Sequence, residues 1–319
     1  MLSRLQPRFR VLHGVFPGRP RPGDVHSVLP RTSGRPGDLG GLPGREQRYC
    51  GGIDMSTPVP GYDCTMDELM VVTFSRAMSN DTRAFNGAVS FIPVSGYLLA
   101  RRTHAPELVW AASSIAIDAD PDKIGDSTLS DSLWGGASML SNSTFDFWAF
   151  AQGARYNTFA FRGAQMDAYG NVNNTVIGPY DAPKVRLPGG GGMADLGAMI
   201  PRIYLWSSTH DPRTFVDQLD FRSGMGWGDG GDHRERLGMP GGPQLCITNL
   251  CVFDFEPDSK RMRLASLHPE VTAEQVQEAT GFEVLMPDGE IPVTAQPTAE
   301  ELHILRTEVD PTSARLREF

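Results

Sequence analysis

The chain has 319 residues, 40% of them hydrophobic, and its 38 acidic residues outnumber its 29 lysines and arginines, giving a net charge of −9. That length and apolar content can form one large domain or two modest ones with a sizeable core. The acidic balance argues against a general nucleic-acid-binding protein, which needs a dominant basic face. The longest nearly apolar stretch, residues 108–117, is about half of the roughly 20 residues that span a bilayer, so we predict no membrane association.

Residues 1–54 differ from the rest in composition. They hold nine arginines against four acidic residues, together with ten glycines and seven prolines. The segment therefore carries +5 and residues 55–319 carry −14. We predict that residues 1–54 are a disordered extension, because such a composition buries too little apolar surface to offset chain entropy. The segment matches neither a secretory signal nor a transit peptide. It is interpreted either as an upstream start codon read into the gene, with the protein beginning at Met55, or as a disordered tail.

From Thr65 onward, helical and strand-like patterns alternate. Thr65 and Glu68 have the spacing of a capping box before a helical repeat, and Thr272 with Gln275 repeats this spacing near the end of the chain. A third such pair, Thr298 and Glu301, predicts another late helix. Further helices are expected at residues 95–102 and 144–156, and strands at residues 88–92, 107–112, 158–161, 185–187, 203–207, 245–255 and 262–267. This alternation predicts an α/β fold, with an open, mostly parallel sheet and helices on both faces.

The cysteines indicate a reducing, cytoplasmic environment and no metal site. Cys246 and Cys251 lie in one apolar run, 245–255, where an extended strand would place them on opposite faces. No second cysteine or histidine pair has the spacing of a zinc site. We therefore expect buried, unreactive thiols.

Two glycine-rich loops are candidates for chemistry. The first contains Gly189, Gly190, Gly191 and Gly192, between a predicted strand and an apolar, helix-compatible segment. Its backbone N–H groups could converge on an anion or an oxyanion, although the loop could equally be a plain flexible turn. It lacks the spacing of a dinucleotide-binding fingerprint and the lysine of a phosphate-binding loop. Taken in isolation, the loop would suggest a nucleotide-binding oxidoreductase.

The second loop, residues 224–232, is long and rich in glycine, which is more typical of a surface lid than of a catalytic centre. Its Trp227 could stack on a substrate or seal the core beneath the loop, and we favour the seal.

Three segments together resemble family I coenzyme A transferases. Residues 163–173 read GAQMDAYGNVN, residues 189–196 follow the family's glycine loop, and residues 234–245 read RERLGMPGGPQL, closest to the beta subunit of glutaconate CoA-transferases. The resemblance runs in order from about Asp67 to Pro311 and leaves residues 1–54 unmatched. It implies that residues 55–319 form a CoA-transferase beta-type subunit.

The resemblance implies an enzyme of two related subunits with its active site at their interface. In the family's transferases a beta-subunit glutamate attacks an acyl-CoA thioester and forms a reversible anhydride. The glycine loop would stabilise the thioester oxyanion. Gln165 and Asp167 could orient the substrate or hold a turn. The implied partners are a CoA-transferase-like alpha subunit and an acyl-CoA substrate, without a bound cofactor, since coenzyme A enters as part of the substrate.

One position departs from the family. Where the glutamate motif E-S-G is expected, after the segment HAPE and a hydrophobic strand, the sequence reads Ser113, Ser114 and Ile115. A serine ester would not exchange CoA as an anhydride does. Ser113 thus leaves three alternatives. The chain is a transferase subunit, or a subunit of the related ring-cleaving acyl-CoA hydrolases of steroid breakdown, which use an alpha-subunit glutamate, or a non-catalytic partner subunit.

Overall fold

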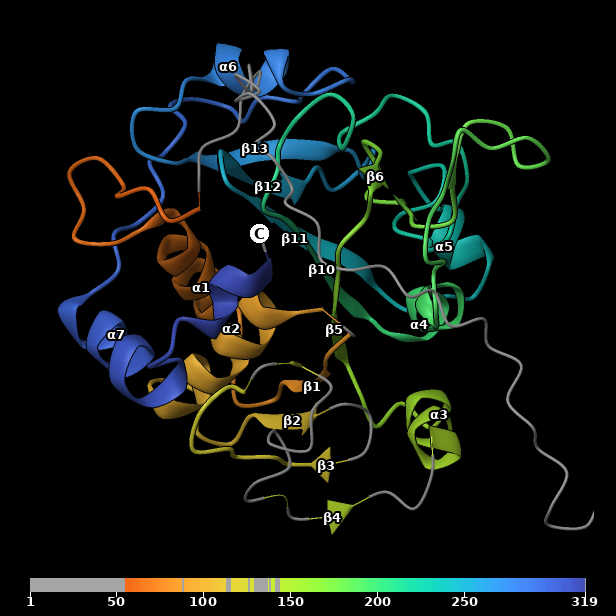
Figure 1. Cartoon of the computed structure of the whole chain (residues 1–319). Coiled ribbons are helices and arrows are strands. Elements are labelled where there is room, and N and C mark those ends of the chain that lie inside the picture. The colour runs from red at the N-terminus through yellow and green to blue at the C-terminus, as the bar shows by residue number, and fades with distance from the viewer. Residues whose placement is uncertain are drawn as a thin grey trace, which may run out of the picture. The chain divides into compact units, whose positions relative to one another are not determined.

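The computed structural model describes residues 55–87, 89–112, 116–125, 127–128, 137, 139–140 and 144–318. Within this part, nine strands form one sheet in the spatial order β13-β12-β11-β10-β5-β1-β2-β3-β4 (Figure 1). In chain order they are β1 (Arg83–Phe85), β2 (Val109–Ala112), β3 (Ala116–Ile117), β4 (Met139–Leu140), β5 (Thr158–Phe161), β10 (Arg202–Ser207), β11 (Gly242–Thr248), β12 (Cys251–Phe255) and β13 (Met262–Leu267).

The five central strands, β11, β10, β5, β1 and β2, are parallel to one another. The two strands at each edge pair antiparallel. Two small hairpins are not part of this sheet. The first pairs β6 (Gln165–Met166) with β7 (Val172–Asn173), and the second pairs β8 (Val176–Ile177) with β9 (Val185–Arg186).

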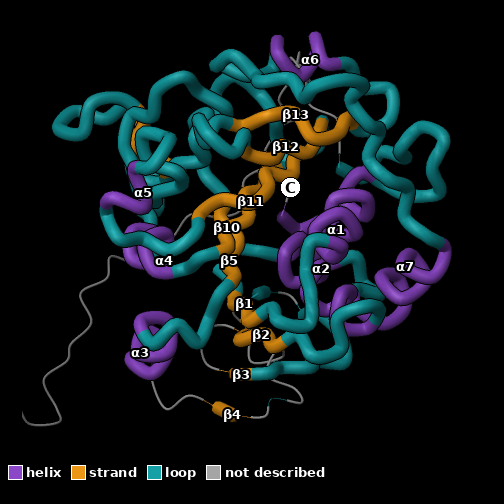
Figure 2. Tube along the Cα trace, turned by 180° about the vertical axis from the view of Figure 1, so that it is seen from behind, coloured by secondary structure: helices purple, strands orange, loops and turns teal. Residues whose placement is uncertain are grey.

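Helices cover both faces of the sheet (Figure 2). One face carries α1 (Met66–Arg76), α2 (Phe91–Arg102), α7 (Ala299–Ile304) and the π-helical turn Leu305–Val309 that continues α7, and the other carries α3 (Thr144–Gln152) and α4 (Met193–Met199). The short helices α5 (His233–Arg236) and α6 (Ala273–Glu278) and a final 3₁₀ helix (Ala314–Glu318) complete the described part. The predicted α/β fold, with a parallel sheet core and helices on both faces, is confirmed.

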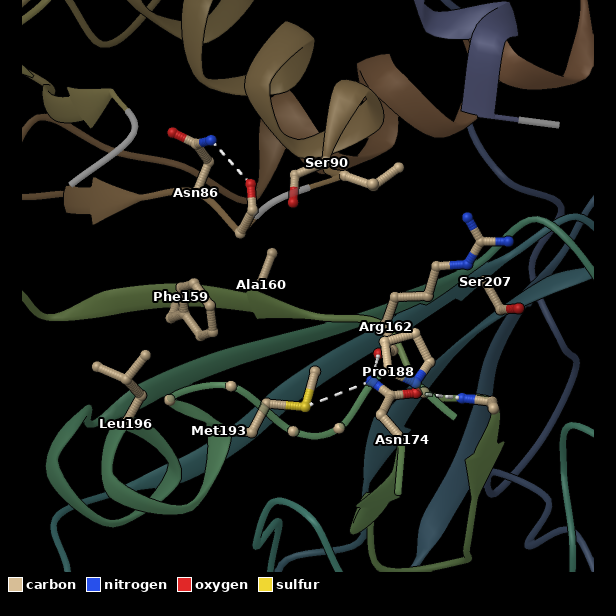
Figure 3. Close-up of a pocket in the computed structure, with 18 of the residues that line it drawn as sticks. Asn86, Ser90, Phe159, Ala160, Arg162, Asn174, Pro188, Met193, Leu196 and Ser207 are labelled. Carbon is tan, nitrogen blue, oxygen red and sulfur yellow. Dashed lines mark hydrogen bonds between the residues drawn. The ribbon is translucent and has the colours of Figure 1, made fainter. Parts of the chain in front are cut away.

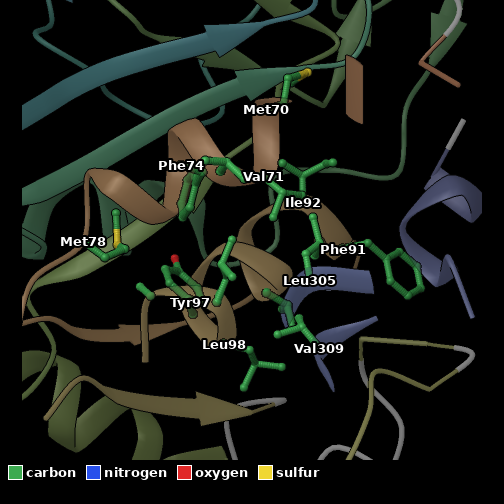
Figure 4. Close-up of a cluster of buried hydrophobic side chains, with 14 of the residues drawn as sticks. Met70, Val71, Phe74, Met78, Phe91, Ile92, Tyr97, Leu98, Leu305 and Val309 are labelled. Atoms are coloured by element: carbon green, nitrogen blue, oxygen red, sulfur yellow. The ribbon is translucent and has the colours of Figure 1, made fainter. Parts of the chain in front are cut away.

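Side chains alternate across the central strands and so form two hydrophobic cores. On β5, Phe159 and Phe161 belong to the core beneath α3 and α4, whereas Ala160 belongs to the core beneath α1 and α2. On β10, Tyr204 and Trp206 join the α1–α2 core. This period of two is what a strand buried on both faces requires. Figure 4 shows the α1–α2 core, in which the two helices pack with the C-terminal π-helical turn.

The three predicted capping boxes are each found at the start of a helix. The N–H of Thr65 donates to Glu68 Oε2 (3.0 Å) at α1. At α6, Gln275 N–H donates to Thr272 Oγ1 (3.2 Å), and at α7 the N–H of Glu301 donates to Thr298 Oγ1 (3.1 Å). Each pair satisfies backbone donors that have no acceptor within their own helix.

The strand predicted over residues 88–92 is wrong, because Phe91 and Ile92 begin helix α2. Pro93 misled the prediction. It occupies the third position of the helix, where a missing N–H costs nothing because that group has no intrahelical acceptor. The strand that precedes α2 is instead β1, which starts at the charged Arg83.

The single strand predicted over residues 245–255 is also wrong. The segment folds into two antiparallel strands, β11 and β12, joined by a tight turn at Asn249 and Leu250. Thr248 Oγ1 accepts hydrogen bonds from the N–H groups of Leu250 and Cys251 (both 3.1 Å). Cys246 and Cys251 are buried free thiols, as predicted, but they share one core rather than lying on opposite faces.

Within the described residues, no helix combines the length and apolar character needed to cross a membrane.

Candidate functional site

A cavity of about 850 Å³ opens where several parallel strands end (Figure 3). Asn86 and Gly87 follow β1, Arg162 follows β5, and Ser207 ends β10, and all of them line the cavity. Because β1, β5 and β10 run in the same direction, the residues that follow them gather at the edge of the sheet formed by the carboxyl ends of the strands. In open α/β sheets this edge is where ligands generally bind.

The predicted glycine loop forms one side of this cavity. Gly189, Gly190, Gly191 and Gly192 all line it, and α4 begins directly after them. Gly189 and Gly191 have φ values of 101° and 53°, which disfavour any residue with a Cβ atom. Gly192 is required for a different reason. A Cβ there would lie 2.4 Å from the Trp148 ring.

Three amides of the loop are available to a ligand. The N–H of Gly189 donates to the carbonyl oxygen of Asn174 (2.7 Å), and the Gly190 carbonyl accepts from Met193 N–H (2.9 Å). By contrast, the N–H groups of Gly190, Gly191 and Gly192 donate to no acceptor in the part of the chain that the structure describes. Of the four predicted oxyanion donors, Gly189 therefore holds the loop in place.

Asn174 fixes the glycine loop to the end of β5. Its side-chain amide donates to the Arg162 carbonyl (2.8 Å) and to the Met193 sulfur (3.4 Å), and its Oδ1 accepts from Ala164 N–H (2.8 Å) (Figure 3). Together with the bond from Gly189, these contacts hold two chain segments in one geometry. Fixed donors of this kind need no reorganisation when charge develops in a reaction.

Gln165 and Asp167, predicted to orient substrate or to hold a turn, lie outside the cavity lining. Gln165 Nε2 donates to Asp220 Oδ2 (2.8 Å), and its Oε1 accepts from Asn173 Nδ2 (2.7 Å). Asp167 accepts from Asn171 Nδ2 (2.8 Å) and from two backbone amides. Burial raises the pKa of Asp167 despite these bonds. Both side chains form part of the scaffold beneath the site.

The second glycine-rich loop is attached to this scaffold. Asn171 Oδ1 accepts from the N–H groups of Gly226 (2.9 Å) and Gly228 (3.0 Å), and its Nδ2 donates to the Gly228 carbonyl (2.7 Å). Trp227 donates from Nε1 to the Pro243 carbonyl (3.1 Å) and does not line the cavity. The tryptophan therefore covers the fold beneath this loop, as favoured from sequence.

Aromatic side chains form an apolar wall of the cavity. Phe85, Phe147 and Phe159 line it, with ring centroids 4.8 Å apart for Phe85–Phe147 and 4.2 Å for Phe85–Phe159. Trp148 extends this wall toward Gly192. A cavity with an apolar wall and a few convergent polar groups is typical of small-molecule sites.

Arg162 and Asp211 are lining residues that sequence reasoning missed. The Arg162 guanidinium lies 5.0 Å from the centre of the Trp206 ring, and its Nη2 donates to Ser208 Oγ (3.1 Å). Asp211 pairs with Arg213 (2.8 Å) and accepts from Thr214 N–H (2.8 Å). Burial alone would raise the pKa of Asp211, but these hydrogen bonds lower it below its ordinary value. Only their positions after β5 and β10 signalled a role.

Ser113, the residue predicted at the family's glutamate position, lies outside the described residues. The strand before it, β2, ends at the buried Ala112. β2 is parallel to β1, with Ala111 beside Phe85. Ala112 is therefore at the same edge of the sheet as Asn86.

Comparisons with known proteins identify the family. The model of the family described as coenzyme A transferase matches residues 112–279. The chain is also 39% identical, over 75% of its length and 91% of the relative, to the B-type subunit of the 3-oxoadipate CoA-transferase of Pseudomonas knackmussii. The chain belongs to the coenzyme A transferase family.

Two further relatives place the chain within this family. The B-type subunit of the glutaconate CoA-transferase of Acidaminococcus fermentans is 31% identical over 78% of the chain and 94% of the relative. The crystal structure of glutaconate coenzyme A-transferase from that organism superposes with a TM-score of 0.72 at 29% identity, over 80% of this chain and 98% of the other. The cholesterol ring-cleaving hydrolase IpdB subunit of Rhodococcus jostii is 31% identical over 80% of the chain and 96% of the relative. The chain is a B-type subunit of the coenzyme A transferase family.

Proposed function

We propose that this chain is the B-type subunit of a cytoplasmic two-subunit enzyme that transfers CoA from an acyl-CoA thioester to a carboxylic acid. The partner is an A-type subunit of the same family, and coenzyme A takes part only as a portion of the substrate. The observation that carries the proposal is the cavity at the sheet edge, which combines three unengaged glycine-loop amides with an aromatic wall. The names of the two transferase relatives support the reaction.

The glycine loop acts on the thioester carbonyl. When a carboxylate attacks this carbon, the carbonyl oxygen gains negative charge, which hydrogen bonds from the N–H groups of Gly190, Gly191 and Gly192 would stabilise. Collapse of the tetrahedral species expels CoA as a thiolate and leaves a mixed anhydride. The thiolate then attacks the carbonyl carbon derived from the enzyme's carboxylate, which releases the acid and leaves an enzyme thioester. The acceptor acid reverses these steps.

The attacking carboxylate comes from the partner subunit. Among the lining side chains that the structure describes, the only carboxylate is Asp211, and its oxygens accept hydrogen bonds from Arg213 and Thr214. A carboxylate stabilised in this way is a weak nucleophile. Ser113, at the family's glutamate position, cannot form an anhydride. Gln165 and Asp167 act as positioning residues that keep the loops around the cavity in register.

The proposal is tested with the chain co-expressed with an A-type subunit of the same family from the same organism. We expect the complex to exchange labelled free acid into acyl-CoA, and Ser113→Ala to retain this exchange within a factor of about three. A Ser113→Ala variant without exchange, in an intact complex, would show that the serine is required. Failure of the wild-type complex to exchange label with any acyl-CoA would contradict CoA transfer itself.

A hydrolase is the second candidate. It is favoured by Ser113 and by the similarity to the ring-cleaving hydrolase subunit, because a carboxylate supplied by the partner could also activate water. In this case the acyl product gains ¹⁸O from labelled water without any CoA acceptor, and exchange of labelled acid is absent.

A further inference from the structure

The β8–β9 hairpin carries an exposed aromatic pair that the proposed function does not use. Tyr180, in the connection between the two strands, stacks on Phe221 with ring centroids 5.5 Å apart. The two side chains nevertheless remain 54% and 37% exposed. In Figure 1 the light-green segment between β6 and α4, which contains this hairpin, extends away from the sheet. An exposed aromatic pair that is already stacked offers a flat apolar face to a planar ligand.

The aromatic pair is held in a defined orientation. The guanidinium of Arg186, on β9, lies over the Tyr180 ring at 5.1 Å, and its Nη2 donates to the Tyr180 carbonyl (3.3 Å). The cation fixes the ring from one strand of the hairpin, while Phe221 supports it from a separate segment. This Tyr180–Phe221 platform is therefore pre-organised, so binding of a planar ligand group would require little further ordering of side chains.

The platform lies close to the glycine loop. Arg186 precedes Gly190 by four residues, which span at most about 14 Å when fully extended. Phe221 precedes Ser223 by two residues, and Ser223 packs against Gly190, where an added Cβ would lie 3.0 Å from it. The pantetheine arm of CoA is longer than the span between Arg186 and Gly190. A thioester at the glycine loop therefore leaves the far end of CoA within reach of the hairpin.

The charge of the hairpin is opposite to that of the chain around it. Lys184 and Arg186 are exposed and two residues apart on one arm, which places them on the same face of an extended segment. With Asp181 as its one acidic residue, the hairpin over residues 176–186 carries +1, whereas residues 55–319 as a whole carry −14. CoA is strongly anionic at its nucleotide end, so a local cationic group is needed to bind it.

We propose that the β8–β9 hairpin binds the 3′-phosphoadenosine end of CoA, with adenine stacked on the Tyr180–Phe221 pair and the phosphate groups contacted by Lys184 and Arg186. This inference rests on the proposed function and names the residues that recognise the nucleotide half of its substrate. Arginine suits phosphate because its planar donors match phosphate oxygens in pairs. Aromatic faces suit adenine because stacking needs no matched hydrogen bonds.

The test compares ligands that differ only at the nucleotide end. Binding of CoA, 3′-dephospho-CoA and pantetheine to the co-expressed complex is measured by isothermal titration calorimetry. We expect Tyr180→Ala to weaken CoA binding about tenfold, as loss of one base-stacking contact implies, and to leave pantetheine binding unchanged. Arg186→Gln should reduce the preference for CoA over 3′-dephospho-CoA. Met286→Ala removes a comparably exposed apolar side chain elsewhere and should change neither.

Size-exclusion chromatography of each variant complex separates the alternatives. If Tyr180→Ala releases the A-type subunit, or weakens CoA and pantetheine equally, the hairpin is a docking arm and the inference is wrong. If both variants bind CoA as the wild type does, the inference is wrong and the proposed function stands. A wild-type complex that binds no CoA would contradict the proposed function and this inference together.

Discussion

Gly192 packs against the Trp148 ring in the candidate site. An added Cβ at Gly192 would meet the Trp148 ring at 2.4 Å. Gly192→Ala must therefore displace either the ring or the loop, at an overpacking cost of about 1–3 kcal/mol. Either movement shifts the loop amides away from the reacting oxygen, and loss of one such donor typically lowers kcat by about 100-fold or more. We therefore expect kcat/KM of the co-expressed complex to fall at least about tenfold.

A double-mutant cycle shows whether this contact is the cause. Trp148→Leu removes the ring that the new methyl group would meet, so Trp148→Leu/Gly192→Ala should lose less kcat/KM than the two single variants predict together. Simple additivity of the two losses would mean that Gly192 is required for another reason.

His210 and His268 make the stability of the fold dependent on pH. Burial lowers the pKa of His210 to about 3 and that of His268 to about 4, so both remain neutral in the folded chain at neutral pH. The unfolded chain protonates them below about pH 6.5. The free energy of unfolding should therefore fall as the pH drops from about 6.5 toward 4, by up to about 1.4 kcal/mol per pH unit for each histidine.

Urea denaturation between pH 8 and pH 5 measures this slope. His210→Gln should be less stable at pH 8, because the ring bonds to Thr248 (2.9 Å) and Thr280 (3.0 Å) are lost. The free energy of unfolding of His210→Gln should also fall less steeply with pH, by the equivalent of about one bound proton. His303→Gln, at an exposed position, serves as the control, and an unchanged slope in His210→Gln would contradict this assignment.

At the scale of elements, the sequence predicted best where a local rule decides the structure. The strands 158–161 and 262–267 and the three capping boxes were located correctly, because alternation and capping are read within a few residues. β1 was missed because it is three residues long and begins with Arg83. The β11–β12 turn was missed because the apolar residues on both sides of Thr248 and Asn249 outweighed the turn signal of Asn249.

In the candidate site, too, features set by local sequence could be predicted and features set by the fold could not. The four glycines were predicted because their cluster is visible in the chain itself. Arg162 and Asp211 could not be predicted, because only the parallel order β10-β5-β1 brings the ends of these strands to one edge. The scaffold role of Gln165 likewise depends on Asp220, which is 55 residues away.

The C-terminal 3₁₀ helix is anchored to α1 by a buried ion cluster. Arg315 contacts Asp67, Glu68 (3.1 Å) and Asp310 (2.9 Å), and all four side chains are buried. Glu68 keeps a second ion pair with Arg306 (2.8 Å). Removing the Arg315 cation would leave Asp67 and Asp310 buried without that partner charge, which typically costs about 3–5 kcal/mol.

Arg315→Met should therefore lower the free energy of unfolding by about this amount in urea denaturation, whereas Arg317→Met, on the exposed side of the same helix, should change it by less than about 1 kcal/mol. A loss below about 1 kcal/mol in Arg315→Met would mean that apolar packing alone holds the C-terminal segment.

At the scale of the whole molecule, the fold supplies a binding site and, among the lining residues that the structure describes, no carboxylate besides Asp211. The sheet edge positions three unengaged amides, an aromatic wall and Arg162 around one cavity. The sole carboxylate among the described lining residues, Asp211, is held by Arg213. The chain is thus suited to hold and polarise a thioester that another subunit attacks.

The most direct test of this account is to locate the covalent intermediate. The co-expressed complex is incubated with acyl-CoA and treated with hydroxylamine or borohydride, and the modified residue is identified by peptide mass spectrometry. We predict that the modification lies on a carboxylate of the A-type subunit and that this chain remains unmodified. An acyl or CoA adduct on Ser113, on Asp211 or on any other residue of this chain would contradict the account.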